Sequence, residues 1–271
     1  MKKRPFLQAL GDEAERTIVN EIAALPTRAF ARGYTGNEMI ETRRPIPAAN
    51  IKLLIWDMDG TLVDSALDLA LAINAMLRHL KLSELPVELI ASYIGNGITD
   101  LVRRSLGDTK DDVLLQDGLA YFIKYYDAHK LDHTHVFSGV MDTLTAIQKR
   151  SNLKMAILTN KSEGLSRGVC DGLGLTRFMS GIYGGDSFAT RKPDPLGAHT
   201  LMQQHGALPT EAVMIGDSLN DILTANNAAM FSVGVSYGLG PEALKKHPPD
   251  VMIDRPEELL ELLGLRNGTH K

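Results

Sequence analysis

Short apolar runs alternate with amphipathic stretches of helix length along most of this chain. The apolar runs end at polar or glycine-rich turns and cover residues 51–56, 154–158, 181–184, 212–215, 230–235 and 250–253. The amphipathic stretches lie near residues 141–150, 163–173, 194–206, 218–228 and 256–263. Runs that are apolar throughout are typical of strands buried on both faces. The alternation therefore predicts an α/β fold, with a Rossmann-like parallel sheet covered by helices.

The interval between the first two apolar runs has no convincing strand pattern. Leu69, Ile73, Leu77 and Leu80 recur at helical spacing. The stretches near residues 86–94, 98–106 and 112–129 also have the pattern of helices. We therefore expect an all-helical cap domain over residues 66–138, inserted into an α/β core that comprises residues 51–65 and 139–271.

Residues 1–50 differ from the rest and are expected to form an N-terminal extension of the core. Ile18, Ile22 and Leu25 share a helical spacing, which predicts one amphipathic helix near residues 12–25. From residue 26 to 50, arginine, glycine, proline and threonine follow without periodicity, so a loop or a partly disordered linker is expected there. The extension carries no chemistry that we recognise, and its role stays open.

Composition narrows the class of protein. The 271 residues are 44% hydrophobic and 23% charged, as in an ordinary globular protein, and the net charge of −4 argues against a nucleic-acid partner. No apolar run reaches the roughly 20 residues that a helix needs to span a bilayer. The apolar run after Met1–Arg4 is also shorter than the apolar segment of a secretory signal peptide, which has roughly 7–15 residues. The single cysteine, Cys170, excludes an intrachain disulfide and fits a reducing compartment. We expect a cytoplasmic monomer or homodimer with no membrane partner.

Polar clusters follow the predicted strands, at the point where each strand ends. In chain order they contain Asp57 and Asp59, then Thr159, then Lys192, then Asp217 and Asp221. Because the carboxyl ends of parallel strands meet at one edge of a sheet, we expect these side chains to share a site. Crowded carboxylates repel one another, and a site with only oxygen ligands favours Mg²⁺ as the counter-ion. A metal ion beside a lysine and a hydroxyl group suits the spread charge of a phosphoryl group.

The four clusters resemble, in order, the four motifs of the haloacid dehalogenase-like hydrolase superfamily. They read Asp57-Met58-Asp59-Gly60-Thr61-Leu62-Val63-Asp64-Ser65, Thr159-Asn160-Lys161, Arg191-Lys192-Pro193-Asp194-Pro195 and Gly216-Asp217-Ser218-Leu219-Asn220-Asp221. The resemblance extends over residues 51–263. Within the superfamily the chain is most similar to phosphoglycolate phosphatases, and the supporting stretches are residues 93–97, 101–103, 184–187 and 234–238.

The resemblance implies a catalytic mechanism and a metal site. Asp57 would be the nucleophile that takes the phosphoryl group, and Asp59 would be the general acid and then the general base. Mg²⁺ would be bound by Asp57, by Asp217 and by the backbone carbonyl of Asp59. Asp221 would position these ligands without contacting the ion itself. The implied reaction is the Mg²⁺-dependent hydrolysis of 2-phosphoglycolate through an aspartyl-phosphate.

The resemblance also implies how a small phosphorylated substrate is bound. Thr159, Asn160 and Lys192 would contact the phosphoryl group, and Gly97 in the insert would lie near the substrate. The helical insert would be a cap that closes over the substrate and excludes water. Residues near Gly95 and Arg103 are expected to decide which substrate fits.

Other functions stay open from the residues alone. The chain could hydrolyse another small phosphomonoester or a pyrophosphate, or it could be a phosphomutase. A metal-independent dehalogenase needs one aspartate only, so Asp59 argues against it, and the complete set of acids argues against a non-enzymatic binding protein. His129, His133 and His135 lie close together in the sequence, but we expect them to lie in a solvated linker and to bind no zinc.

Overall fold

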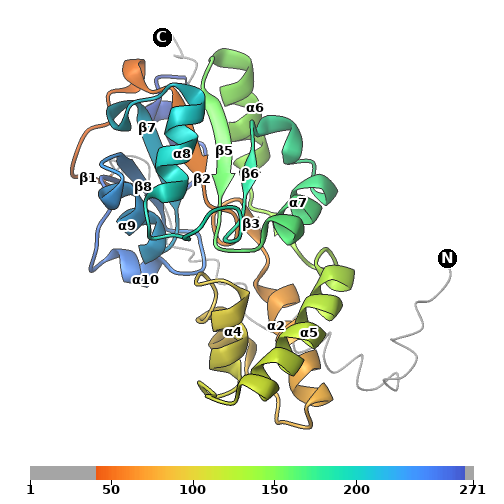
Figure 1. Ribbon diagram of the computed structural model, residues 1–271. Coiled ribbons are helices and arrows are strands. Elements are labelled where there is room, and N and C mark those ends of the chain that lie inside the picture. The colour runs from red at the N-terminus through yellow and green to blue at the C-terminus, as the bar shows by residue number, and fades with distance from the viewer. Residues whose placement is uncertain (1–40, 266–271) are drawn as a thin grey trace, which may run out of the picture. The chain divides into compact units, whose positions relative to one another are not determined.

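A seven-stranded sheet forms the centre of the computed structural model, which describes residues 41–265 (Figure 1). Its strands are β1 (Glu41–Thr42), β2 (Leu53–Trp56), β5 (Lys154–Leu158), β6 (Ile182–Tyr183), β7 (Ala212–Gly216), β8 (Phe231–Val235) and β9 (Val251–Ile253). The strand order is β1-β9-β8-β7-β2-β5-β6. All neighbours are parallel except β1 and β9. The predicted α/β class with a parallel sheet is confirmed.

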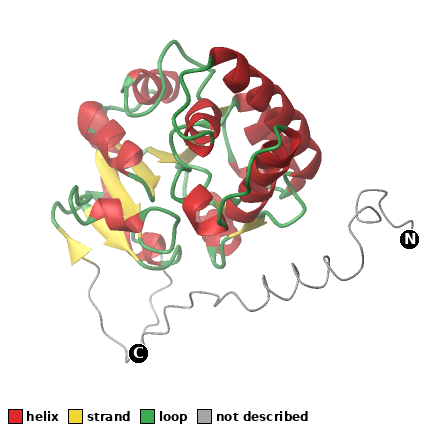
Figure 2. Ribbon diagram, turned by 90° about the horizontal axis from the view of Figure 1, so that it is seen from below, coloured by secondary structure: helices red, strands yellow, loops and turns green. Residues whose placement is uncertain are grey.

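Helices cover both faces of this sheet. They are α6 (Val140–Arg150), α7 (Glu163–Gly172), α8 (Leu196–His205), α9 (Leu219–Asn227), α10 (Pro241–Leu244) and α11 (Glu258–Leu262). Successive side chains of a strand point to opposite faces. Accordingly, Leu54 and Trp56 pack in one apolar cluster with α6, α7 and α11, whereas Leu53 and Ile55 pack in another with α8 and α9. Figure 2 shows the strands lying among the helices.

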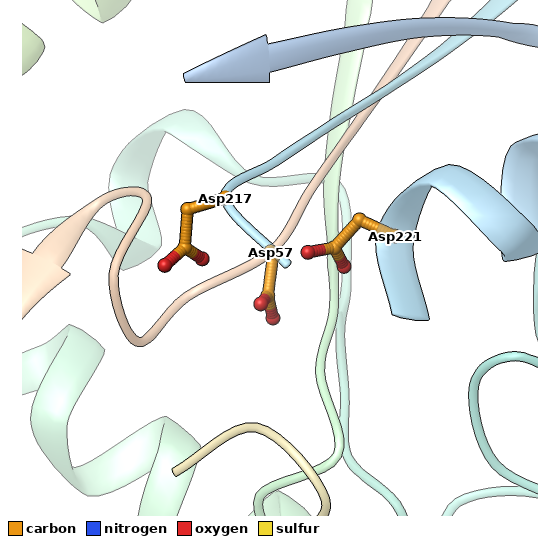
Figure 3. Close-up of side chains that lie close together, drawn as sticks. All are labelled: Asp57, Asp217 and Asp221. Carbon is orange, nitrogen blue, oxygen red and sulfur yellow. The ribbon is translucent and has the colours of Figure 1, made fainter. Parts of the chain in front are cut away.

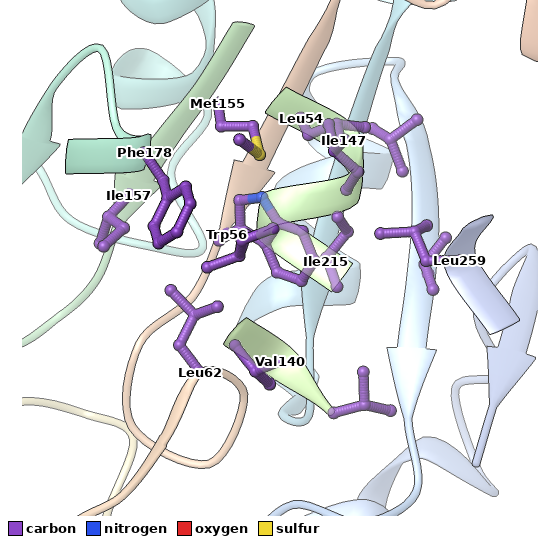
Figure 4. Close-up of a cluster of buried hydrophobic side chains, with 14 of the residues drawn as sticks. Leu54, Trp56, Leu62, Val140, Ile147, Met155, Ile157, Phe178, Ile215 and Leu259 are labelled. Atoms are coloured by element: carbon purple, nitrogen blue, oxygen red, sulfur yellow. The ribbon is translucent and has the colours of Figure 1, made fainter. Parts of the chain in front are cut away.

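Trp56 lies in the middle of the larger apolar cluster. Figure 4 shows its ring surrounded by Leu54, Ile147, Ile215 and Phe178, which come from different strands and helices, and its side chain is fully buried. The last residue of β2 is thus held by packing on every side. This packing holds the end of the strand, and so the polar residues that follow it, in a defined position.

A group of helices is inserted between β3 (Val63–Asp64) and β4 (His135–Val136). They are α2 (Ala66–His79), α3 (Val87–Ala91), α4 (Ile98–Ser105) and α5 (Asp112–His129). Their apolar faces form a third cluster, in which Ile73, Phe122 and Tyr126 are fully buried. Among the described residues, no helix is both long enough and apolar enough to cross a membrane. The helical insert is observed as predicted, while its assignment as a separate domain with the boundaries 66 and 138 stays a prediction.

Two expectations about strands are wrong. The stretch from 66 to 138 contains β4, which pairs antiparallel with β3 and so joins the two connections between sheet and insert. The expected loop of residues 26–50 contains β1, which adds an antiparallel edge to β9. Next to β1, the Arg44 guanidinium binds Asp250 and lies 4.2 Å from the centre of the Phe231 ring. The helix predicted near residues 12–25 lies outside the described residues.

Candidate active site

The chain turns sharply after β2 and places Asp57 in the interior. The amides of residues 61–63 all donate hydrogen bonds to the carbonyl oxygen of Met58, which closes a tight loop. Gly60 has a φ of 88°, in the left-handed region that favours glycine. A Cβ atom at this position would also lie 2.2 Å from Oδ2 of Asp217. The loop conformation and the close approach of Asp217 therefore both require glycine at position 60.

Three buried carboxyl groups meet at the carboxyl ends of β2 and β7. Asp57 follows β2, Asp217 follows the adjacent strand β7, and Asp221 lies in the first turn of α9. Each offers one oxygen, and these oxygens lie within 4.8 Å of one another. Figure 3 shows Asp57 between the other two. The parallel pairing of β2 with β7 thus brings together carboxylates that are 160 residues apart, as the sequence predicted.

Lys192 provides positive charge inside this acidic group. Its Nζ lies 2.8 Å from Oδ1 of Asp57 and 2.5 Å from Oδ1 of Asp221, and its side chain is almost completely buried. Burial alone would lower the pKa of Lys192, but the carboxylates of Asp221 and Asp57 outweigh it and raise the pKa above its usual value. The lysine therefore stays charged and fixes the position of the Asp57 carboxyl group.

One lysine does not balance all three acids. Burial and the neighbouring Asp221 raise the pKa of Asp57 to about 7, although Lys192 opposes the shift. Burial and repulsion from Asp221 and Asp57 raise the pKa of Asp217 to about 8, although the amides of residues 239–240 donate hydrogen bonds to it. Both carboxyl groups thus carry an electrostatic strain that a nearby cation would relieve.

The carboxylates fit a divalent cation that prefers oxygen ligands. Asp221 already uses both of its oxygens, because Oδ1 binds Lys192 and Oδ2 accepts hydrogen bonds from the amide and hydroxyl of Ser218 at the start of α9. Oδ2 of Asp217 accepts hydrogen bonds from the amides of residues 239–240, but its Oδ1 accepts a longer one, at 3.3 Å, from Oγ1 of Thr61. Asp57 uses Oδ1 toward Lys192. Asp57 and Asp217 are therefore better able than Asp221 to turn an oxygen toward an ion. Carboxylate oxygens without nitrogen or sulfur ligands suit Mg²⁺.

Asp59 takes part in a second polar network, which the sequence did not predict. Its Oδ1 accepts a hydrogen bond from Ser65 Oγ at 2.5 Å and lies 3.0 Å from Nζ of Lys161. Lys161 Nζ also donates to the hydroxyl oxygen of Tyr126 in α5, at 2.7 Å. Burial would lower the pKa of Lys161, but Asp59 and Tyr126 outweigh it and hold the pKa above its usual value. The network joins the loop after β2 to the helical insert.

A pocket lies between the sheet edge and the insert. The residues that line it are Asp57, Asp59, Thr159, Asn160 and Lys161 on the sheet side, and Leu69, Ile94, Gly95, Gly97, Ile98 and Leu101 on the insert side. The sheet side is polar and charged, whereas the insert side is apolar apart from the backbone near the two glycines. A small molecule with one charged end would therefore bind with that end toward Asp57.

The loop around Gly97 is held against the sheet edge. Asn160 Nδ2 donates hydrogen bonds to the carbonyl oxygens of Gly95 and Lys192, and Asn220 Nδ2 also donates to Gly95. A Cβ atom on Gly97 would lie 2.9 Å from the carbonyl oxygen of Asn160. The Asn160 amide thus connects the insert to the sheet, and its predicted contact with a phosphoryl group stays a prediction.

The structure brings the predicted site residues to one place. Asp57, Asp59, Thr159, Asn160 and Gly97 line the pocket, and Lys192, Asp217 and Asp221 surround Asp57. Their roles in catalysis stay predictions. Residues near Gly95 and Arg103 are expected to select the substrate; Gly95 and Leu101 line this pocket, whereas Arg103 itself does not.

Sequence reasoning missed three residues of this site. Lys161 stood inside a quoted motif, directly after a strand, and its position could have marked it as a candidate. Ser65 also stood inside a motif, the one that begins at Asp57, but nothing in that motif indicates its contact with Asp59. Tyr126 gave no such signal, because only the folded chain brings it to Lys161.

His129, His133 and His135 are not part of the group of residues in the described chain whose geometry could hold a metal ion, and the expectation that they bind no zinc stays a prediction. Within residues 41–265, the constellation with suitable geometry is the one formed by Asp57, Asp217 and Asp221. Nδ1 of His129 lies 2.7 Å from Oδ2 of Asp132, and His135 is exposed in β4.

The chain is similar to known proteins in sequence and in structure. The chain is 35% identical to phosphoglycolate phosphatase of Photobacterium profundum over 79% of its own length and 96% of that protein. It is 38% identical to phosphoglycolate phosphatase of Chromobacterium violaceum over 81% of its own length and 98% of that protein. The crystal structure of a predicted phosphoglycolate phosphatase from Haemophilus somnus superposes with a TM-score of 0.75 at 28% identity, covering 79% of this chain and 98% of that one.

A family model matches the part of the chain that holds the site. It is the model of haloacid dehalogenase-like hydrolases, and it covers residues 54–235, from β2 to the end of β8. The matched segment includes every acid and lysine of the site. With this match and with relatives that align over nearly their whole length, the chain belongs to the haloacid dehalogenase-like hydrolase family.

Proposed function

We propose that this protein is a Mg²⁺-dependent phosphatase that hydrolyses 2-phosphoglycolate to glycolate and inorganic phosphate. The observation that carries the proposal is the ion pair between Asp57 and Lys192 at a pocket that Asp59 also lines. A nucleophilic carboxylate, a fixed positive charge and a second carboxylate are the groups that two-step phosphoryl transfer needs. The choice of 2-phosphoglycolate as the substrate rests on the relatives, which are named phosphoglycolate phosphatase.

In the first step, Asp57 would accept the phosphoryl group. One of its carboxylate oxygens attacks phosphorus, and the bond from phosphorus to the ester oxygen breaks. Asp59 gives its proton to that leaving oxygen, which releases glycolate as the alcohol. Lys192 holds Asp57 in place and partly neutralises the phosphoryl oxygens, while the Thr159 hydroxyl donates a hydrogen bond to them.

In the second step, water would release the phosphoryl group. Asp59, now a carboxylate, takes a proton from a water molecule whose oxygen attacks phosphorus. The bond from phosphorus to Asp57 then breaks, and inorganic phosphate leaves. Ser65 and Lys161 hold the Asp59 carboxyl group in position throughout. When bound by Asp57 and Asp217, Mg²⁺ supplies positive charge that stabilises the charge on the phosphoryl oxygens.

The helical insert would act as a cap over a small substrate. Its apolar residues close one side of the pocket, and the loop around Gly97 is bonded to the sheet edge. Excluding water during the first step protects the acyl phosphate until the leaving group has departed. A cytoplasmic location and a monomeric or homodimeric state belong to the same proposal and rest on the sequence.

The proposal is tested by phosphate release from a panel of phosphate esters and pyrophosphate. The panel contains 2-phosphoglycolate, p-nitrophenyl phosphate, glucose 6-phosphate and pyrophosphate, each assayed with Mg²⁺ and with EDTA. We expect the highest kcat/KM for 2-phosphoglycolate and loss of turnover in EDTA. Equal rates on all esters would refute the substrate, and full activity in EDTA would refute the metal requirement. Product analysis with the sugar phosphate detects a phosphomutase as an isomerised ester.

A further inference from the structure

Lys161 is the cationic side chain among the residues that line the pocket. The other charged residues of the lining are Asp57 and Asp59, and the insert contributes only apolar side chains and glycines. A carboxylate that enters a mostly apolar pocket needs a cation as its partner, because an unpaired buried charge is costly. Lys161 can meet that need without any rearrangement of the fold.

The position of Lys161 relative to the reacting atoms is set by Asp59. Its Nζ lies 3.0 Å from Oδ1 and 3.2 Å from Oδ2 of this residue. In the proposed reaction, Asp59 gives a proton to the ester oxygen, so Lys161 must lie beside the leaving group. In 2-phosphoglycolate the carboxylate is separated from the ester oxygen by a single methylene. A cation next to Asp59 is therefore in the right region to meet it.

The ammonium group of Lys161 is fixed by three acceptor atoms, which are Oδ1 and Oδ2 of Asp59 and the hydroxyl oxygen of Tyr126. The contact with Oδ2 is the longest of the three, at 3.2 Å, so a substrate carboxylate would take the donor that now points to Oδ2 while the other two hydrogen bonds stay in place. The Tyr126 ring packs against the same group, with its centre 4.6 Å from Nζ. Both Lys161 and Tyr126 are buried, so little side-chain entropy is lost when an anion binds.

We propose that Lys161, held in place by Tyr126 of the insert, binds the carboxylate of the substrate and selects phosphate esters whose leaving group is anionic. This inference rests on the proposed phosphatase function. It gives Lys161 a role different from that of Lys192, which forms an ion pair with Asp57. Tyr126 is a positioning residue, since it acts through Lys161.

Arg191 is the rival cation. It is exposed, and its Nη1 lies 3.1 Å from the position that a Cβ atom would occupy if residue 97 had one. Arg191 therefore approaches the loop that lines the pocket. It is absent from the pocket lining itself. A variant of Arg191 therefore belongs in the same experiment.

The test compares esters that differ in one carboxylate. The pairs are 2-phosphoglycolate with ethyl phosphate, and 2-phospholactate with isopropyl phosphate, and the measured quantity is the ratio of kcat/KM within each pair. We expect the wild-type protein to favour the carboxylate in both pairs. We expect Lys161→Met to lower this ratio about 10- to 100-fold, the value of one charge-assisted hydrogen bond. Turnover of the neutral esters also falls, because Asp59 loses a partner, but by less.

Tyr126→Phe provides a second variant that keeps the lysine. We expect a smaller fall of the same ratio, about 2- to 10-fold, since one hydrogen bond to Lys161 is lost. If Lys161→Met fails to fold, this variant decides. The matched controls are Lys124→Met and Tyr121→Phe, which lie in α5 as Tyr126 does. Circular dichroism checks that each variant is folded.

Each outcome decides the inference. An equal loss on both members of a pair in Lys161→Met would overturn it and show that the lysine serves Asp59 only. Loss of the preference in Arg191→Met, but not in Lys161→Met, would overturn it as well. A wild-type protein that favours the carboxylate in both pairs, but turns over 2-phospholactate with a higher kcat/KM than 2-phosphoglycolate, refutes the proposed substrate and supports the inference. A wild-type protein that favours neither carboxylate refutes both.

Discussion

Asp57 is the residue on which the proposed chemistry depends most. We expect Asp57→Asn to lower kcat by at least about a thousandfold, because an amide oxygen is a poor nucleophile for phosphorus. The variant should fold normally and be slightly more stable without metal, since it removes one of three repelling buried carboxyl groups. Steady-state assays and thermal unfolding measure both effects. Asp142→Asn, at an exposed position of α6, is the control, and substantial activity in Asp57→Asn would exclude Asp57 as the nucleophile.

Cys170 should be inert in the folded protein. Burial, followed by the nearby Asp59, raises the pKa of its thiol to about 12, and the side chain is completely inaccessible. Because the thiolate is the reactive form, the raised pKa leaves very little of it near pH 8. We expect alkylation by iodoacetamide to be at least about a hundredfold slower in the native protein than in guanidinium chloride. Equally fast labelling of the native protein would contradict the buried position.

The acids and the lysine of the site could be predicted, whereas their partners could not. Asp57, Asp217 and Lys192 stand directly after strands or before a helix, and parallel strands bring such positions together. Lys161 and Tyr126 meet only because α5 approaches the end of β5. No periodicity or spacing in the sequence specifies that approach.

At the scale of elements, Asp68 fastens the start of the insert to its end. It lies in the first turn of α2, and its carboxylate accepts hydrogen bonds from the amides of His133 and Thr134 and from the Thr134 hydroxyl. Its side chain is buried. The two connections between sheet and insert are therefore tied together beside the β3–β4 pair.

We expect Asp68→Asn to destabilise the protein by about 1–3 kcal/mol, because an amide cannot accept all of these hydrogen bonds and leaves buried donors unpaired. Urea unfolding measures the loss. Asp117→Asn, at an exposed position of α5, should change the free energy of unfolding far less. An unchanged stability in Asp68→Asn would show that the connections are held by packing alone.

The strands that the sequence did not reveal are very short, although β6, which the apolar run 181–184 predicted, is equally short. β1, β3 and β4 have two residues each, too few to show an alternation of apolar and polar positions. They form because their backbone groups find a partner, at the edge of the sheet for β1 and in each other for β3 and β4. The longer strands were predicted to within a few residues, since burial on both faces makes them apolar throughout.

At the scale of the whole molecule, metal binding should couple activity to stability. A ligand that binds only the folded state stabilises it, by about 2.7 kcal/mol at a concentration 100 times its Kd. We therefore expect Mg²⁺ to raise the unfolding temperature of the wild-type protein and EDTA to reverse the change. Asp217→Asn should largely abolish this response, because it removes one of the two carboxylates that fit the ion. A response of full size in Asp217→Asn would place the metal elsewhere.

The order of the strands explains why the site lies where it does. β2 has β5 on one side and β7 on the other, so the loops after all three strands meet at one edge. The inserted helices lie between β2 and β5 in the sequence, so both of their connections to the sheet lie beside that edge. The alternation of elements predicted that these loops meet at one edge and that a helical insert follows the first strand. The strand order, and which loops the insert contacts, depend on packing that the sequence pattern does not show.

Detection of the phosphorylated enzyme tests the central claim most directly. The wild-type protein is mixed with 2-phosphoglycolate and Mg²⁺, quenched in acid within one turnover, and its peptides are weighed by mass spectrometry. We predict the added mass of a phosphoryl group on the peptide that contains Asp57, located on Asp57 by fragmentation, and its absence in Asp57→Asn. A phosphoryl group on another residue, or turnover of 2-phosphoglycolate in Asp57→Asn at the wild-type rate, would contradict the account.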